Sequence, residues 1–433
     1  MQGTYILCIG IWGSNMGVLS GFADKRMRKL TQKAKRFGVF AFLSASLILG
    51  AGMDLGAEAA KKKSKKKAPL PEVSVDEILS PNPMLLLDVD TGKVLYHRNG
   101  NQKWYPASLT KMMTAYVTFR AIASGELHPD SLVEISPHAL SYPPSKMGFK
   151  VGTRLTVDNA LKMVIVKSAN DIAAALAERV SGSEAAFARR MNDEAHRLGM
   201  VSSNFVNANG IHRPGQKSSA RDMAVLARAI LIEFPQYRPL FQIPAIRHGK
   251  RILRSYNKLL ESYAGTNGMK TGFVCASGFN LVAAANRNGR QLVAVVLGAP
   301  NTQSRAETAA YLLNRGFTQP NMVSGRGLSI AQSASFGPQL EPINMRPEIC
   351  TKRSNPKWSG RVKVIGSYLE PRFKLMDPVR VYAGIKKKKG RVVMPAQLVH
   401  LPLAAPRAKG PLKLTQLRKA QSGGLISLPK PKP

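Results

Sequence analysis

Acidic residues, cysteines and aromatic residues are scarce in this chain of 433 residues. It carries 25 Asp and Glu against 64 Lys and Arg, which gives a formal net charge of +39. Aromatic residues are only 7% of the sequence and do not alternate with the basic runs, so the chain lacks a stacking surface and we expect no nucleic-acid partner. No cluster of His, Cys and Asp has metal-ligand spacing, and we expect neither a metal nor another cofactor.

The N-terminal apolar run over residues 38–51 is shorter than the roughly 20 residues of a membrane-spanning helix. It follows a basic stretch at 25–36 and precedes Ala57-Glu58-Ala59, a small-residue cleavage pattern. Residues 1–24 show no clean span, and Met27 is a better start for such a segment. We therefore predict an N-terminal extension and signal peptide over 1–59, with a permanent anchor as the alternative, and an exported protein of the periplasm or cell envelope.

Export changes how the few cysteines are interpreted. Cys8 lies in the segment that would be removed, which leaves Cys275 and Cys350 as the cysteines of the exported chain. Cysteine pairs form disulfides in oxidising compartments. We predict a Cys275–Cys350 disulfide, with two buried thiols as the alternative.

The order of expected elements indicates the fold class. A Lys-rich linker over 60–79 precedes a folded domain over 80–320. Strand patterns at its two ends flank helical periodicity from residue 108 to about 234, and a last helix covers about 305–314; the strands are expected at 84–89, 93–96, 268–274, 279–284 and 292–297. This predicts an α+β fold, a mainly antiparallel sheet flanked by helices, with a helical insertion and with first and last strands that meet.

Residues 321–433 form a basic, Pro- and Lys-rich C-terminal extension. Short alternating runs at 361–365 and 379–382 predict a few strands, and residues from about 402 onward are expected to be disordered. The leucines at 412–417 are too few for an amphipathic membrane helix. The basic ends predict attraction to an anionic membrane surface or an acidic wall polymer, with a solvated tail as the alternative.

Three short motifs in the folded domain carry hydroxyl and amine groups. Ser108 stands at an expected helix start, and Lys111 follows one turn later on the same face. A serine becomes nucleophilic when a neighbour accepts its proton, and a lysine accepts it only if burial and positive charge lower its pKa. Lys270 is a candidate for that charge. The helix start also makes the backbone N–H of Ser108 a candidate oxyanion donor.

The other two motifs are Ser168-Ala169-Asn170, between two helical segments, and Lys270-Thr271-Gly272, on an expected strand. For Ser168 the alternative role is a helix N-cap. A glycine within a strand predicts close approach of another group, here a substrate backbone laid along the strand, with a simple bulge as the alternative. A Ser-x-x-Lys pattern also occurs at 64–67 in the linker, so the motif carries weight only beside the others.

Four sequence blocks resemble the D-alanyl-D-alanine carboxypeptidases, the low-molecular-mass penicillin-binding proteins of serine peptidase family S11. The blocks lie at 105–114, 167–171, 214–223 and 268–272, and the resemblance covers about residues 81–317. It implies a serine β-lactamase/transpeptidase-like fold. It also implies an enzyme that removes the terminal D-alanine from the pentapeptide stem of peptidoglycan and is acylated by β-lactam antibiotics.

The resemblance assigns a role to each motif residue. Ser108 would form the acyl-enzyme with Lys111 as base, and Ser168 would pass a proton to the leaving amine. The substrate would be held by the side chains and strand backbone of Asn170, Lys270, Thr271 and Gly272. The backbone N–H of Phe273 would join that of Ser108 in the oxyanion hole.

Three alternative functions remain at this stage. A D,D-endopeptidase of the same family cleaves beside the same D-alanine. A class A β-lactamase would need a Glu-x-x-Leu-Asn run, and none follows Ser168. A non-catalytic wall-binding protein would be expected to lack the nucleophile or its lysine, and both are present. Arg247, Arg251 and Arg254 are further candidates for a carboxylate contact, with no basis for choosing among them.

Overall fold

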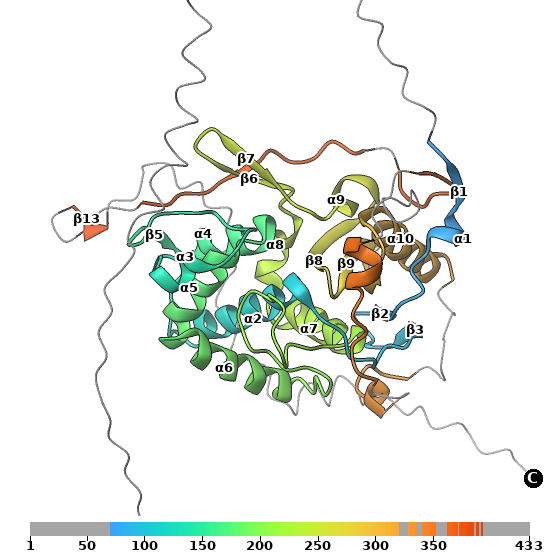
Figure 1. The fold of residues 1–433 in the computed structure, drawn as a ribbon, viewed down its shortest axis with the longest axis horizontal. Helices are drawn as coiled ribbons and strands as arrows, with labels where there is room; N and C mark the ends of the chain where they lie inside the picture. The colour runs from blue at the N-terminus through green and yellow to red at the C-terminus, as the bar shows by residue number, and fades with distance from the viewer. Residues whose placement is uncertain are drawn as a thin grey trace, which may run out of the picture. The chain divides into compact units, whose positions relative to one another are not determined.

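The centre of the fold is a five-stranded antiparallel sheet in the order β3-β2-β10-β9-β8. Its strands are β2 (Met84–Asp88), β3 (Val94–Arg98), β8 (Thr266–Val274), β9 (Gly278–Arg287) and β10 (Arg290–Ala299). The computed structural model (Figure 1) describes residues 70–319, 328–335, 340–351, 362–370, 372–384, 387–388 and 391–392. β2 pairs with β10, which confirms that the first and last predicted strands meet.

Alternate residues of the sheet face two separate apolar cores. Leu85 and Val295 face the larger core, which the inserted helices complete. Leu86 and Val296 face the smaller core, which α9 (Leu259–Ser262) and α10 (Thr302–Thr318) cover. Both cores draw on the same strands because side chains in a strand alternate between its two faces. The predicted α+β class is therefore confirmed, with helices on both sides of the sheet.

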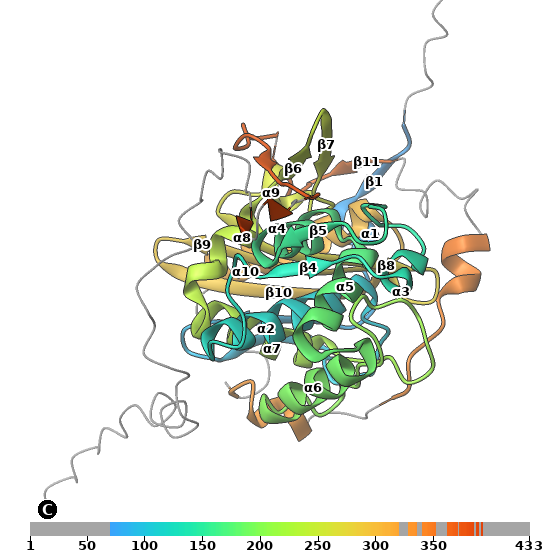
Figure 2. The same ribbon diagram turned by 90° about the vertical axis from the view of Figure 1, so that its left-hand side faces the viewer.

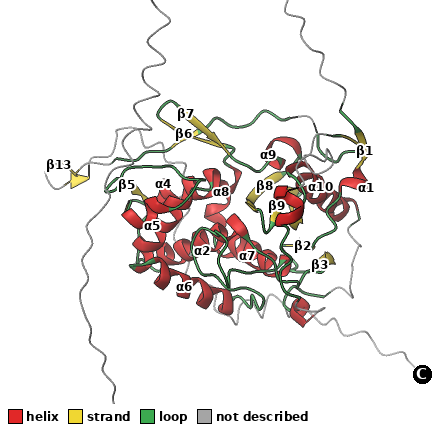
Figure 3. Ribbon diagram, viewed as in Figure 1, coloured by secondary structure: helices red, strands yellow, loops and turns green. Residues whose placement is uncertain are grey.

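The helical insertion lies between β3 and β8 and gathers on one side in Figures 1 and 3. Its helices are η1 (Ala107–Leu109), α2 (Thr110–Ala123), α3 (Pro137–Ser141), α4 (Val157–Lys162), the π-type turn η2 (Met163–Lys167), α5 (Asn170–Ser181), α6 (Glu184–Arg197), α7 (Ala220–Glu233), η3 (Pro235–Tyr237) and α8 (Arg238–Gln242). A small hairpin of β4 (Leu132–Glu134) and β5 (Arg154–Thr156) interrupts them.

Helix α2 is the axis of the insertion, and every residue from Thr110 to Phe119 is buried. A helix that is apolar on most faces is stable only when other helices surround it. Several neighbouring helices begin at side-chain caps; in α7, for example, the Ser219 hydroxyl accepts a hydrogen bond from the Asp222 N–H. These local signals fix where the helices start, and burial fixes how they pack.

The linker predicted over 60–79 is wrong in its last part. Residues 72–78 form β1 (Glu72–Ser74) and α1 (Val75–Ile78), and a capping box joins Ser74 and Glu77. β1 pairs in parallel with β11 (Lys363–Ile365), and Val75 and Ile78 pack against Val362. The partner lies at the far end of the sequence, so local composition could not reveal it. The predicted extension and signal at 1–59 lie outside the described residues.

Two strands predicted in the C-terminal extension are confirmed as β11 and β12 (Val379–Arg380). β12 joins a hairpin that sequence analysis missed, β6 (Ala245–His248) and β7 (Arg251–Arg254), in the order β12-β6-β7. Figure 2 shows this hairpin at the opposite end from α6. The other elements described after α10 are η4 (Gln332–Ser335), η5 (Pro347–Thr351), β13 (Lys387–Lys388) and β14 (Arg391–Val392). The tail from about residue 402, predicted to be disordered, lies outside the described residues.

Among the residues that the structure describes, every helix is too short or too polar to cross a bilayer.

Candidate active site

Ser108 lies in η1, the tight turn that leads into α2. The residue before it, Ala107, has φ +48°, a left-handed conformation that is costly for alanine. The turn is held from outside, because Asn280 donates hydrogen bonds to the carbonyls of Tyr105 (2.9 Å) and Pro106 (3.2 Å). Strand β9, which carries Asn280, thus fixes the backbone around Ser108, the candidate nucleophile.

Gly272 explains how closely β8 approaches that turn. A Cβ at this position would lie 2.8 Å from the Pro106 carbonyl oxygen and 3.1 Å from the Ser108 nitrogen. The close approach predicted for Gly272 is real, but its partner is the turn that carries Ser108 rather than a substrate backbone. Only glycine lets the Lys-Thr-Gly strand run against the Ser108 turn without moving that turn.

Lys111 is completely buried and has three neighbours for its amine. Its Nζ lies 3.0 Å from the Ser108 hydroxyl, 2.8 Å from the side-chain oxygen of Asn170 and 2.6 Å from the backbone oxygen of Asn209. Burial holds the pKa of Lys111 well below its ordinary value, and the positive charge of Lys270 lowers it further. The Asp171 carboxylate opposes this shift. The predicted pairing of Ser108 with Lys111 is therefore present.

Ser168 and Lys270 form a second hydroxyl–amine pair. Lys270 Nζ donates to the Ser168 hydroxyl at 3.0 Å and to the Thr271 carbonyl at 2.9 Å. Burial and the positive charge of Arg305 lower the pKa of Lys270 to about 7. The N-cap alternative for Ser168 is wrong, because Ser168 adopts a left-handed conformation after η2 and Ala169 is the N-cap of α5.

Asn170 connects the Ser108–Lys111 pair to the loop that contains Pro143. Its oxygen accepts from Lys111, and its Nδ2 donates to the Pro143 carbonyl at 2.9 Å. The next residue, Asp171, accepts from the backbone N–H groups of Met147 (3.0 Å) and Gly148 (2.8 Å). The Ser-x-Asn motif and the acidic residue after it therefore hold the loop at 143–148 beside the two lysines.

Thr271 and Phe273 complete the predicted set on β8. Thr271 is 7% exposed, whereas Phe273 is 38% exposed and its ring lies 4.3 Å from that of Phe279. Phe273 is thus an exposed aromatic side chain beside a buried polar centre, and its backbone follows Gly272 directly.

Sequence analysis missed two contributors to the site. Arg305, in α10, is buried and donates to the backbone oxygens of Asn280 (3.4 Å) and Tyr256 (3.3 Å), and its charge acts on Lys270. Its position in a helix expected to pack against the sheet was the one sequence signal that Arg305 is buried near the site. The contribution of Asn209 is a backbone carbonyl, for which no side-chain signal exists. The arginines considered earlier, at positions 247, 251 and 254, are instead exposed on the β6–β7 hairpin.

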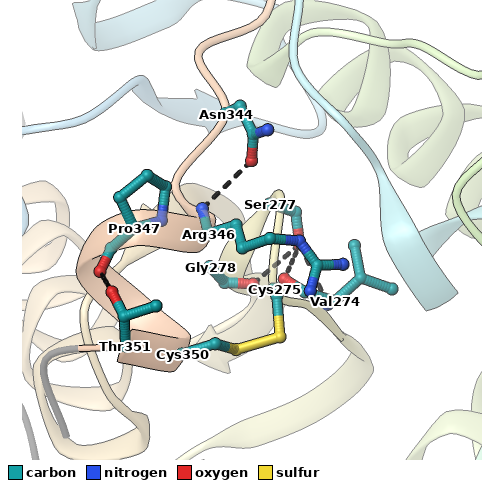
Figure 4. The surroundings of a disulfide bond; sticks show 9 residues. All are labelled: Val274, Cys275, Ser277, Gly278, Asn344, Arg346, Pro347, Cys350 and Thr351. Atoms are coloured by element: carbon teal, nitrogen blue, oxygen red, sulfur yellow. Dashed lines mark hydrogen bonds between the residues drawn. A yellow bond between two sulfur atoms is a disulfide. The ribbon is translucent and has the colours of Figure 1, made fainter.

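The predicted disulfide is confirmed, and Figure 4 shows its surroundings. Cys275 directly follows β8 and is bonded to Cys350 in η5, with 5.8 Å between their Cα atoms. The bond ties the end of the Lys-Thr-Gly strand to the C-terminal extension.

Known proteins are similar to this chain over slightly more than half of its length. The chain is similar to D-alanyl-D-alanine carboxypeptidase DacD of Escherichia coli, with 36% identity over 54% of this chain and 62% of that protein. It is 34% identical to DacF of Bacillus subtilis over 54% of this chain and 61% of that protein. The chain therefore spans about three fifths of the length of these curated relatives.

The fold resembles solved penicillin-binding proteins. Penicillin-binding protein 6B from Escherichia coli gives a TM-score of 0.53 at 35% identity and covers 55% of this chain and 78% of that chain. Penicillin-binding protein D2 from Listeria monocytogenes, in its cefotaxime-bound form, gives 0.51 at 29% identity and covers 55% and 98%. The profile of a family described as D-alanyl-D-alanine carboxypeptidase matches residues 71–301. With the Ser108, Ser168 and Lys270 motifs meeting at one site, the chain belongs to peptidase family S11.

Proposed function

We propose that this protein is a serine-type D-Ala-D-Ala carboxypeptidase that removes the terminal D-alanine from peptidoglycan stem peptides. Family membership supports the reaction class. The single observation that carries the proposal is the environment of Lys111, a buried amine 3.0 Å from the Ser108 hydroxyl with its pKa well below the ordinary value.

The hydrogen bonds of Lys111 suit a general base. A neutral amine has two N–H bonds and one lone pair. The oxygens of Asn170 and Asn209 take the two N–H bonds, and the lone pair then faces the Ser108 hydroxyl. Ser108 attacks the carbonyl carbon of the penultimate D-alanine as its proton passes to Lys111. The backbone N–H groups of Ser108 and Phe273 stabilise the oxyanion.

The second pair serves the leaving group and the substrate carboxylate. Ser168, held by Lys270, passes its hydroxyl proton to the nitrogen of the departing D-alanine as the C–N bond breaks, and the proton that Lys111 took from Ser108 then returns to Ser168. A pKa near 7 lets Lys270 carry a positive charge once a carboxylate binds, because an opposite charge favours the charged form. Thr271 adds a hydroxyl donor, and Asn170 orients the substrate amide. Water then hydrolyses the acyl-enzyme and restores Ser108.

The experiment uses the purified protein with a pentapeptide stem and with a cross-linked dimer, and follows released D-alanine by mass spectrometry. We expect release from the pentapeptide and its loss in Ser108→Ala. The matched control is Ser64→Ala, which alters the Ser-x-x-Lys pattern of the linker and should keep full activity. No release, or release that survives Ser108→Ala, contradicts the proposal, and preferred cleavage of the dimer indicates the endopeptidase.

Penicillin provides a second test of the same site. The Listeria relative was solved with cefotaxime bound, and we propose that β-lactams acylate Ser108 here. Mass spectrometry of the digested protein should find the adduct on the peptide that contains Ser108. Rapid turnover of penicillin without a lasting adduct would favour a β-lactamase instead.

We also propose that the protein acts outside the cytoplasm, where its basic ends bind an anionic surface. The disulfide supports an oxidising compartment, and the signal pattern and the Lys-rich tail support export and anionic partners. Sedimentation with vesicles containing phosphatidylglycerol, and separately with isolated cell walls, distinguishes a lipid surface from a wall polymer. If the full-length protein stays in solution with both the vesicles and the cell walls, the proposed binding to an anionic surface is contradicted.

A further inference from the structure

Residues 340–351 of the C-terminal extension, here called the tail segment, contact the rest of the fold at two places, at Lys103 and at the turn between β8 and β9. At one end the Leu340 carbonyl accepts a hydrogen bond from the Lys103 N–H at 3.0 Å, and Glu341 forms an ion pair with the Lys103 amine. At the other end Cys350 is bonded to Cys275. The family profile ends at residue 301, so the tail segment lies beyond the matched region.

The first contact leads along the chain to Ser108. Lys103 is followed by Trp104, which is fully buried and pairs through its backbone with Ser218. The Trp104 indole donates to the Ser277 carbonyl at 2.9 Å. A few residues later the chain enters the turn of Ser108, whose N–H is one proposed oxyanion donor. The contact at Lys103 therefore lies close to Ser108 along the sequence, on a segment that buried Trp104 holds in place.

The second contact leads to Phe273, the other proposed donor. β8 ends at Val274, and Cys275 begins the turn to β9. Within this turn the Ser277 hydroxyl bonds to the backbone of Val274, as Figure 4 shows. The Ala276 carbonyl accepts from the Met345 N–H at 3.0 Å. The turn is thus held by its own serine, by Trp104 and by the tail segment.

Side chains of the tail segment also pack beside the turn between β8 and β9. Met345 and Ile349 are buried in the main apolar core. A Cβ at Gly278, the first residue of β9, would lie 2.9 Å from the Met345 sulfur and 3.0 Å from the Ala299 oxygen. The tail segment fills the space beside the turn, and the disulfide fixes it there.

We infer that the tail segment, cross-linked through Cys350, positions the two backbone oxyanion donors, Ser108 N–H and Phe273 N–H, for the acylation step. This inference rests on the proposed function. An oxyanion hole works only when its donors lie at about 2.7 to 3.1 Å from the developing charge. One donor is on a turn and the other is beside a strand end, and the tail segment restrains both. Cys350 touches no reacting atom and acts as a positioning residue.

The test removes the Cys275–Cys350 bond and measures its effect on transition-state binding and on ground-state binding separately. Two forms are compared with the wild type, the Cys275→Ser/Cys350→Ser double variant and the folded wild type treated with a phosphine reductant. We expect the penicillin acylation rate constant and the affinity for a peptide boronic acid, which forms a tetrahedral adduct, to fall together by about tenfold. The dissociation constant of the non-covalent penicillin complex, taken from the concentration dependence of acylation, should stay within about twofold, because the oxyanion does not exist in that ground state.

A purely structural disulfide gives a different pattern. The melting temperature would fall, while the acylation rate constant and the boronic acid affinity, measured well below it, would stay at wild-type values; that result overturns the inference. Glu126→Gln is the matched control, since it breaks the exposed ion pair with Arg190 far along the sequence from both contacts and should change none of the three quantities.

Hydrogen exchange makes the inference testable without activity. Reduction should speed amide exchange at residues 273–277 and 104–108 relative to the rest of the sheet. Unchanged exchange there, with the disulfide fully reduced, contradicts the inference even if the protein forms no penicillin adduct. A wild type without an adduct contradicts the proposed function, whereas a reactive wild type matched by its reduced form contradicts only the role of the tail segment.

Discussion

Lys111 and Lys270 each bring a buried amine to 3.0 Å from a serine hydroxyl, yet their surroundings differ. Lys111 has two further oxygen acceptors, from Asn170 and Asn209. Among the described residues, Lys270 has one further acceptor, its neighbouring backbone carbonyl, and the positive charge of Arg305 lowers its pKa. Under the proposed function, the same side chain therefore serves two tasks, since these surroundings suit Lys111 to proton acceptance and Lys270 to anion binding.

The largest difference between the two lysines is expected when each is replaced by arginine. Arginine stays protonated in proteins, so Lys111→Arg removes the base while it keeps the charge. We expect penicillin acylation to fall by at least about 10³-fold, or about 4 kcal/mol of transition-state stabilisation. Lys270→Arg keeps the anion-binding charge and should lose only about tenfold. Stopped-flow acylation measures both.

Equal losses in the two arginine variants would contradict the division of tasks. Circular dichroism must show that both variants fold, because each places a larger side chain in a buried site. If Lys270→Arg loses as much as Lys111→Arg while folded, Lys270 also handles protons.

Removal of the Ser168 hydroxyl should have the next largest effect. Ser168→Ala leaves Lys270 in place and removes the group proposed to protonate the leaving amine, so D-alanine release should fall by about 10²-fold. Ser202→Ala is the matched control, because Ser202 begins another Ser-x-Asn pattern of the chain, at 202–204, and its hydroxyl donates to the Asn101 carbonyl. Full activity of Ser168→Ala would leave the Ser168–Lys270 pair without a role in proton transfer.

The sequence predicted the side chains of both pairs and Asn170 beside them, but not Arg305 or the Asn209 carbonyl. The three motifs, the strands around them and the cysteine pair follow from local patterns and from residue chemistry. Arg305 looked like one polar residue of a helix, and the Asn209 contribution is a backbone oxygen. Neither leaves a periodic signal, because periodicity reports which face of an element is buried and not what lies opposite.

The pairing of β1 with β11 was not predicted for the same reason, although the meeting of the first and last strands of the central sheet was. β1 was assigned to a linker because its partner β11 follows almost three hundred residues later. The left-handed conformation of Ser168 was also missed, since a serine between two helices is usually a cap. Gly272 was correctly expected at a close approach, and only the structure identified the partner as the Ser108 turn.

Gly272 lies where strand β8 approaches the Ser108 turn. Its substitution tests the importance of this close approach, with a smaller expected effect. In Gly272→Ala the new methyl group meets the Pro106 oxygen at 2.8 Å, which should push β8 and Lys270 away from Ser108. We expect the free energy of unfolding to fall by about 1 to 3 kcal/mol and acylation to fall by about tenfold. Urea unfolding and acylation kinetics measure these. Gly100→Ala, where a Cβ has only ordinary contacts near 3.5 Å, is the control, and equal behaviour of the two variants would contradict the argument.

The smallest expected effect is on the pH dependence. Lys270 binds a carboxylate only when it is charged, and its pKa of about 7 means that this charge is lost as the pH rises through that value. For a pentapeptide with a free C-terminus, kcat/KM should therefore decline by a few-fold above about pH 7, since this ratio reports the free enzyme. A pentapeptide amide, which has no carboxylate, should react slowly without this decline. Arg305→Gln removes a positive charge that lowers the pKa of Lys270, so the decline should move to higher pH. A decline that is identical for acid and amide peptides, or that does not move in Arg305→Gln, would assign the titration to a group other than Lys270.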